Sequence, residues 1–127
     1  MDNFQRTIRR IRRRIEANIL NIEKYKYNKV VLLETQSTLE EELSNFTVEW
    51  DEFHEYLSII EDDIPEAKAE KGAQVVLKKA LEKKVDLSVR RSSQLSDAVI
   101  ERKVKAETAR ARLQYVEEAE RLKKRTV

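Results

Sequence analysis

Residues 32–64 read LLETQSTLEEELSNFTVEWDEFHEYLSIIEDDI, and the spacing of their apolar side chains decides the fold. Alternate steps of four and three from Leu32 reach an apolar or aromatic residue at every position up to Ile64 except Gln36. A seven-residue repeat of this kind is typical of a helix in a coiled coil. The stretch therefore predicts a long helix with one apolar stripe.

The same phase continues back to Phe4 without a slip. Of the eighteen positions reached between Phe4 and Ile64, fifteen are apolar or aromatic. The polar exceptions are Asn18, Lys29 and Gln36. We therefore expect a first helix over residues 3–61, ended near the only proline, Pro65, because proline disrupts a helix interior but is tolerated in a first turn.

A second helix is predicted over residues 66–124, after a turn at residues 62–66. Its stripe is thinner, since eight of twelve positions are apolar and many of these are small. The positions are Leu81, Val85, Ser88, Ser92, Leu95, Val99, Arg102, Ala106, Ala109, Leu113, Val116 and Glu120. The predicted fold is all-α: one domain over residues 1–127, a long antiparallel helical hairpin completed to a bundle by self-association or by a partner.

Charge favours this hairpin over one continuous rod. Residues 34–66 hold twelve acidic residues and no Lys or Arg, a net charge of −12. Residues 67–97 hold eight basic and four acidic residues, a net charge of +4. Opposite charges beside an apolar stripe favour pairing of the two segments. A turn near residue 65 places residue i beside about residue 130 − i.

Composition gives no indication of an enzyme. The chain has one glycine, one proline and no cysteine, and 39% of its residues are charged, so phosphate-binding loops and thiolate metal sites are not expected. The single histidine, His54, lies among acidic residues and is better explained as part of a solvated surface than as a metal ligand or general base. We expect no enzymatic activity, cofactor, metal or small-molecule substrate.

Two short segments predict a self-association surface. Val30, Val31 and Leu33 lie in a run that is apolar on successive helix faces, and so do Ala98 and Ile100. The hairpin register places the two runs side by side at the middle of the rod. A helix that is apolar on every face is normally buried on every face, so we expect a second copy to pack here as a homodimer or higher oligomer.

A basic end is the other candidate binding surface. The hairpin would place an N-terminal arginine cluster beside a C-terminal basic cluster, and together they would bind an anionic partner. The residues are Arg6, Arg9, Arg10, Arg12, Arg13, Arg14, Arg121, Lys123, Lys124 and Arg125. A protein partner or a second copy is favoured, an anionic membrane is the alternative, and nucleic acid is disfavoured because the basic face lacks interleaved aromatic residues.

Aromatic residues gather near the predicted turn. Trp50 and Phe53 lie on the apolar stripe and Tyr56 lies close to it. Burial in the core is the favoured interpretation, and a protein-binding tip is the alternative because exposed Trp and Tyr are frequent interface anchors.

These features predict a non-enzymatic structural or adaptor subunit that acts through helix–helix contacts. In shape alone, the predicted hairpin resembles components of secretion, export, and viral or phage assembly. The alternative is a peripheral membrane protein that docks through its arginine-rich end. The longest apolar runs are four residues, so we expect no signal peptide or transmembrane segment and an intracellular, cytoplasmic location.

Overall fold

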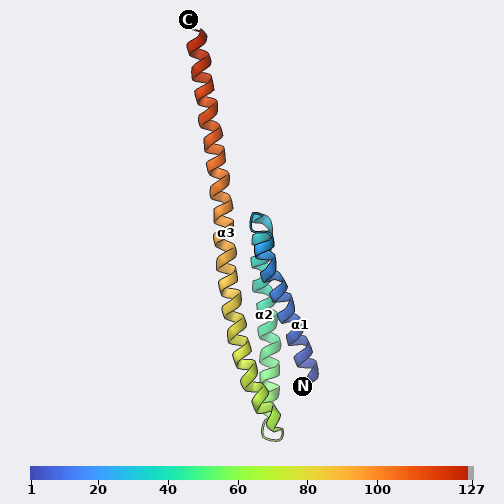
Figure 1. Ribbon diagram of the computed structural model, residues 1–127. Helices are drawn as coiled ribbons and strands as arrows, with labels where there is room; N and C mark the ends of the chain where they lie inside the picture. Colours follow the sequence, from blue (N-terminus) through green and yellow to red (C-terminus); the bar gives the residue numbers. More distant parts are fainter. Residues whose placement is uncertain (126–127) are drawn as a thin grey trace.

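The computed structural model describes residues 1–125 and contains three helices (Figure 1). They are α1 (Asp2–Lys24), α2 (Lys29–Ile60) and α3 (Pro65–Arg125). Each helix runs antiparallel to the next, and α1 packs against both α2 and α3 (Figure 1). The all-α prediction is confirmed for the described residues, which contain no strand. The prediction of a single first helix over residues 3–61 is wrong, because the chain reverses direction at residues 25–28.

Local hydrogen bonds explain why the first helix stops. The N–H of Tyr25 donates to the carbonyl of Asn21 (2.9 Å), and the N–H of Asn28 donates to the carbonyl of Tyr25 (2.9 Å), which closes the turn. Asn28 then has an extended backbone and its side chain accepts a hydrogen bond from the N–H of Val31 (3.2 Å). Asparagine is among the preferred residues at this capping position. Asn28 therefore begins α2 as a new helix.

The reversal buries one face of each helix in a common core. From α1 the core takes Ile8, Ile11, Ile15 and Ile22, from α2 Leu32, Leu39, Phe46, Phe53 and Leu57, and from α3 Ala67, Leu81 and Val85. Phe4 packs at the edge, with its ring stacked on Phe53 at 5.2 Å between centroids. The isoleucines of α1 thus fill the third side of a bundle that α2 and α3 alone would leave open.

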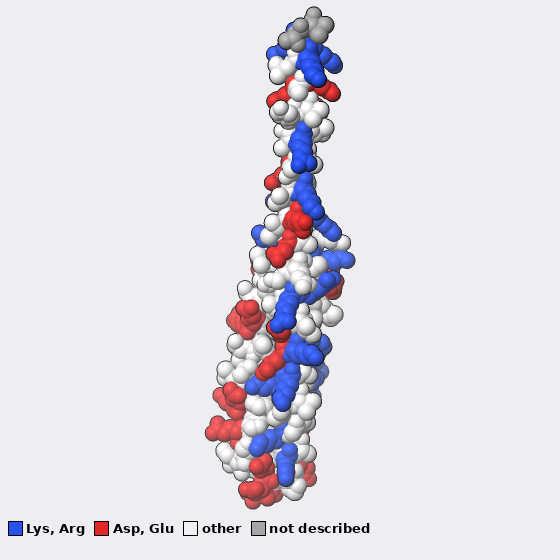
Figure 2. Space-filling model, turned by 90° about the vertical axis from the view of Figure 1, so that its left-hand side faces the viewer, with Lys and Arg blue, Asp and Glu red and all other residues white. Residues whose placement is uncertain are grey.

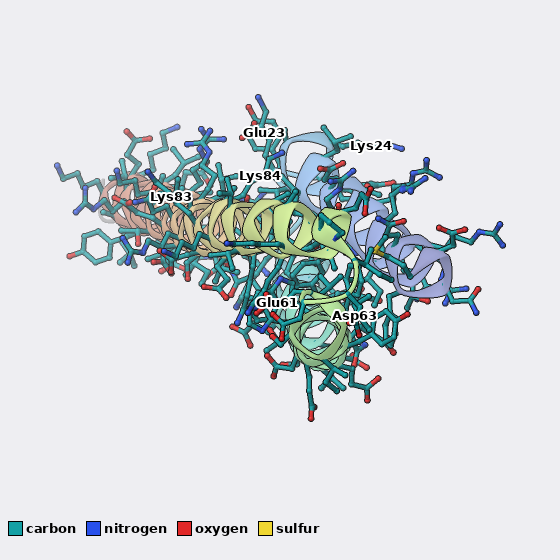
Figure 3. All side chains as sticks on the ribbon, turned by 90° about the horizontal axis from the view of Figure 1, so that it is seen from below. Glu23, Lys24, Glu61, Asp63, Lys83 and Lys84 are labelled. Carbon is teal, nitrogen blue, oxygen red and sulfur yellow. The ribbon has the colours of Figure 1, made fainter. Side chains whose placement is uncertain are left out.

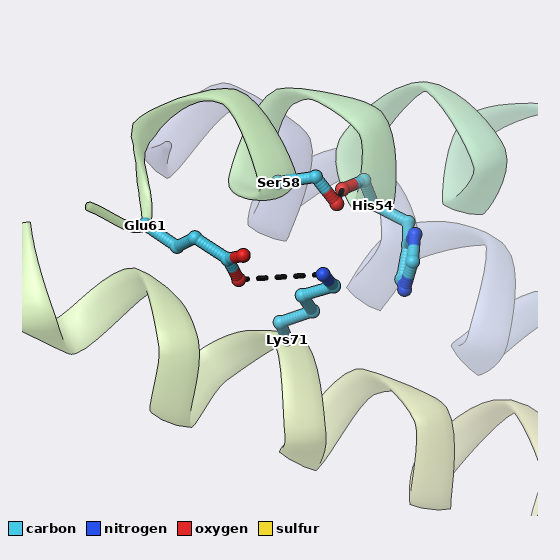
Figure 4. Close-up of polar contacts among 4 residues, drawn as sticks. All are labelled: His54, Ser58, Glu61 and Lys71. Atoms are coloured by element: carbon cyan, nitrogen blue, oxygen red, sulfur yellow. Dashed lines mark hydrogen bonds and ion pairs between the residues drawn. The ribbon is translucent and has the colours of Figure 1, made fainter.

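The second turn lies close to its predicted place. Helix α3 begins at Pro65, and the carbonyl of Ile64 accepts a hydrogen bond from the N–H of Ala67 (3.0 Å). The structure gives the turn as residues 61–64 where the sequence predicted 62–66. Lys71 of α3 reaches back to Glu61 at 3.3 Å, beside the end of α2 (Figure 4). The residue numbers 61 and 71 add up to 132, close to the sum of 130 that the predicted hairpin register gives.

Polar contacts fix the register farther along α2 and α3. The indole Nε1 of Trp50 donates to the carbonyl of Gln74 (3.0 Å), and Gln36 Nε2 donates to the hydroxyl of Ser92 (3.1 Å). The same buried hydroxyl donates to the carbonyl of Leu32 (3.0 Å). These three hydrogen bonds hold α2 and α3 in one register.

Unequal helix lengths set the shape of the molecule. Helix α3 has 61 residues and α2 has 32, so α3 is about 90 Å long and α2 about 48 Å long at 1.5 Å per residue. Residues beyond Val99 of α3 extend past the α1–α2 turn as a single helix (Figure 1). We call residues 100–125 the overhang.

Charge is distributed along the bundle rather than from end to end. Acidic side chains gather on one side of the bundle and basic side chains run along another, while the overhang carries both (Figure 2). Seen from the α2–α3 turn, Glu61 and Asp63 lie at that turn while Lys83 and Lys84 lie farther along α3 (Figure 3). Lys84 lies 4.0 Å from Glu16 and Arg91 lies 3.1 Å from Glu23, so both ion pairs join α3 to α1.

Candidate interaction surface

The overhang is a helical surface on which no other helix of the described chain packs. From Ile100 to Arg125 every side chain is exposed except that of Ala119, which is half-buried. Large apolar residues are among them: Ile100, Val104, Leu113, Tyr115, Val116 and Leu122. The sequence did not predict this surface, because in the predicted hairpin the start of the first helix covered residues 98–124. Since α1 folds back along α2, that cover is absent.

Apolar residues of the overhang form two stripes. One continues the seam of the packed half of α3 and contains Ala106, Ala109, Leu113 and Val116, with Arg102 and Glu120 at its ends. The other contains Ile100, Val104, Ala111, Tyr115 and Leu122, about half a turn away. Arg102 lies over the ring of Tyr27 at 5.3 Å, which directs the first stripe toward the side of the α1–α2 turn.

The predicted self-association belt lies where the overhang leaves the bundle. Val30, Leu33, Ala98 and Ile100 are exposed, and Val31 is half-buried. The side chain of Val30 is 63% exposed and that of Ile100 is 39% exposed, so both are accessible to a partner. The structure thus brings the belt residues to one level of the molecule, and whether a second copy packs on them stays a prediction.

The arginine cluster of α1 lies beside acidic residues of the bundle. Arg10 and Arg14 line a recess with Glu42 and Glu49 of α2. Arg9 and Arg12 line a second recess with Glu70 and Gln74 of α3. Of the six arginines only Arg12 is half-buried, and Arg6, Arg9, Arg10, Arg13 and Arg14 are exposed. The cluster therefore follows the acidic helix, where sequence analysis had placed it at a free end.

The C-terminal basic residues lie far from that cluster. Arg121, Lys123, Lys124 and Arg125 belong to the last turns of α3, at the opposite end of the molecule from the N-terminus (Figure 1). The prediction that the two clusters form one basic end is wrong. Its cause is the reversal at residues 25–28, which carries the N-terminus back to the α2–α3 turn.

The aromatic residues near that turn are committed to packing. Phe53 is fully buried, and Trp50 and Tyr56 are half-buried against the core. Lys78 lies over the ring of Trp50 at 4.2 Å, and Phe4 lies 5.4 Å from the ring of Tyr56. The core interpretation is confirmed for Phe53. Trp50 and Tyr56 keep part of their surface exposed, so the protein-binding tip stays a prediction for these two residues.

His54 contacts neighbouring residues of its own helix. Its ring stacks on Trp50 at 4.6 Å, and its carbonyl accepts a hydrogen bond from the hydroxyl of Ser58 (2.9 Å; Figure 4). Within residues 1–125, no group of three or more His, Cys, Asp or Glu side chains could hold a metal ion. Over the same residues, no helix has the length and apolar content needed to cross a membrane.

Comparison of the chain with protein-family models, with curated proteins and with solved structures finds no match. Function is therefore inferred from the packing and charge of the chain's own residues.

Proposed function

We propose that this chain is a non-enzymatic structural or adaptor subunit that acts through helix–helix contacts made by the overhang. One observation carries the proposal: 26 consecutive helical residues, 100–125, have no helix packed on them. Most helical stability in proteins comes from packing of an apolar face, and isolated helices are marginal in water. A partner helix would cover the apolar stripes and stabilise this segment.

The bundle and the overhang then have separate tasks. Residues 1–99 form a three-helix unit with its own core, while the overhang presents a stripe of the spacing that a coiled-coil partner requires. Docking on an anionic membrane is the weaker alternative, since it relied on one joint basic end and the two basic clusters lie at opposite ends (Figure 1).

The proposal is tested by measuring whether the wild type and two variants of the chain associate with themselves or with other proteins. Leu113→Asp with Val116→Asp places charge on the stripe, whereas Gln114→Asp places charge beside it on an equally exposed position. We expect the wild type and the Gln114 variant to associate, with themselves or with another helical protein, and the stripe variant to lose that association. An unassociated wild type whose overhang amides exchange freely, in isolation and in cell extract, would contradict the proposal.

A further inference from the structure

The stripe of the overhang has an order that is self-complementary. Counted outward from Ala111, Ala109 and Leu113 are two residues away on either side, and Ala106 and Val116 are five residues away. Arg102 and Glu120 are nine residues away. A two-fold axis through residue 111 therefore pairs a small residue with a larger one in two layers, and a cation with an anion in the third.

We infer that two copies of this chain pair through their overhangs as an antiparallel two-helix coiled coil over residues 99–123. This inference rests on the proposed function, and it identifies the partner helix as a second copy. In an antiparallel coiled coil, stripe positions of one helix face stripe positions of the other in layers. Here Ala106 faces Val116 and Ala109 faces Leu113 of the second copy, so these apolar layers have similar total volumes, which helps the helices to keep a constant separation.

Charge selects the antiparallel orientation. The two-fold places Arg102 opposite Glu120 of the second copy, and Lys103 opposite Glu117 of the second copy along one edge of the stripe. Symmetry doubles each pair. In a parallel arrangement Arg102 would face Arg102 and Glu120 would face Glu120 inside the stripe, and like charges held together at an interface strongly disfavour a wrong arrangement.

The position of the bundle agrees with this register. The α1–α2 turn, closed at residues 25–28, decides where α3 becomes exposed, and the last side chain before the overhang is the half-buried Val99. The stripe alone decides that the axis lies at residue 111. With that axis, Val99 faces residue 123 of the second copy, so the paired segment begins at the level where the bundle ends and extends for about 37 Å.

A charge-reversal series tests the pairing. We expect the wild type to have twice the 15.0 kDa mass of the chain in sedimentation velocity at tens of micromolar. Arg102→Glu alone and Glu120→Arg alone each create two like-charged layers and should weaken the dimer by about tenfold or more. The double variant Arg102→Glu with Glu120→Arg exchanges the two charges and should restore it. In a parallel dimer the double variant would restore nothing.

Control variants separate this surface from the rest of the chain. Lys83→Glu makes the same change of charge at an exposed position on the packed half of α3 and should leave the dimer unchanged. Circular dichroism should show all variants helical, since the substitutions lie outside the core. A dimer that tolerates the single reversals but dissociates on Val31→Glu with Ile100→Glu would overturn the inference and identify the belt as the interface. A monomeric wild type whose overhang still binds another helical protein would overturn it while leaving the proposed function standing.

A distance measurement tests the orientation directly. The chain has no cysteine, so Ser93→Cys provides a single site for a spin label, and residue 93 is exposed. With the axis at residue 111, the two labels lie 36 helical residues apart along the dimer, about 54 Å. A parallel pair would bring them to within about 20 Å. A short distance, or no dipolar coupling at concentrations where the mass is that of a dimer, would overturn the antiparallel pairing.

Discussion

Helix α3 is one unbroken helix whose two halves lie in opposite surroundings. Residues 65–99 pack on α1 and α2, and Ala67, Leu81, Val85, Ser92 and Ser96 are buried there. The overhang continues the same stripe, but its side chains are exposed. A seven-residue repeat thus predicts burial of a face without telling which chain buries it. In the packed half the chain covers its own stripe, and in the overhang the stripe is available to a second copy.

The largest expected difference between the two regions concerns their cores. Phe46→Ala removes a fully buried ring from the bundle, and we expect a loss of about 3–5 kcal/mol in unfolding free energy. Leu113→Ala removes a side chain that is 60% exposed in the overhang. At nanomolar concentration, where we expect the chain to be monomeric, this substitution should change bundle unfolding by less than about 0.5 kcal/mol. Denaturant unfolding followed by Trp50 fluorescence measures both.

The Leu113 variant becomes informative at higher concentration. There we expect its dimer to be weaker than that of the wild type, because Leu113 faces Ala109 of the second copy. A large loss of bundle stability from Leu113→Ala in the monomer would mean that the overhang folds back on its own bundle, and the contrast between the two halves would be incorrect.

A smaller effect is expected at the buried hydroxyl of the packed half. Ser92 donates to the carbonyl of Leu32 and accepts from Gln36, so Ser92→Ala leaves two polar groups without that partner. We expect a loss of about 1–2 kcal/mol in unfolding free energy. Ser93→Ala, one residue further and exposed, is the matched control and should change stability by less than about 0.5 kcal/mol. Equal effects of the two substitutions would argue against the observed register of α2 and α3.

A substitution that raises helix propensity should stabilise the packed half of α3, whereas Ser92→Ala should destabilise it. Gly72 lies in the packed half of α3, and a methyl group added there would meet no atom within 4 Å. Gly72→Ala should therefore stabilise the bundle by about 0.5–1 kcal/mol. Thr108→Ala also raises helix propensity, but in the exposed overhang, and should leave bundle unfolding of the monomer unchanged. Thermal unfolding at low concentration distinguishes them, and a stabilised bundle in the Thr108 variant would mean that the two halves unfold as one unit.

Much of the fold could be predicted from the sequence. The regular stripe and near absence of glycine and proline predict helices, and Pro65 predicts the α2–α3 turn to within a few residues. The α1–α2 turn could not be found from periodicity, because Tyr25 and Lys29 keep the seven-residue phase on both sides of it. A repeat carries no information about chain direction when the turn preserves its phase. The available signal was Asn28, a preferred helix-capping residue two positions before the apolar run that begins at Val30.

One missed turn altered both candidate surfaces. With the first helix continuous, residues 1–33 would have covered the overhang and completed one basic end. With the reversal, the six arginines of α1 lie along the bundle, where residues 34–66 carry a net charge of −12. In the predicted hairpin, this negative charge was paired only with the positive charge of residues 67–97. The acidic helix in fact lies between two basic ones, because both α1 and α3 pack against it.

The smallest expected effect gives the sharpest test of what covers the overhang. Lys103 and Arg110 lie one seven-residue repeat apart, so they occupy the same edge of the stripe. In the antiparallel dimer Lys103 faces Glu117 of the second copy, whereas Arg110 lies near the axis and faces its own counterpart. Lys103→Ala removes two charge pairs and should weaken the dimer about fivefold, and Arg110→Ala removes one like-charged pair and should strengthen it about two- to threefold, since exposed charge pairs contribute roughly 0.5 kcal/mol each, of either sign. Dissociation constants from sedimentation equilibrium at fixed ionic strength measure both changes.

The two variants also separate a second copy from other partners. Each substitution removes one positive charge, so both would weaken the binding of an anionic membrane or an acidic protein to the overhang. Opposite signs are expected only where residue 110 meets residue 110 of a second copy.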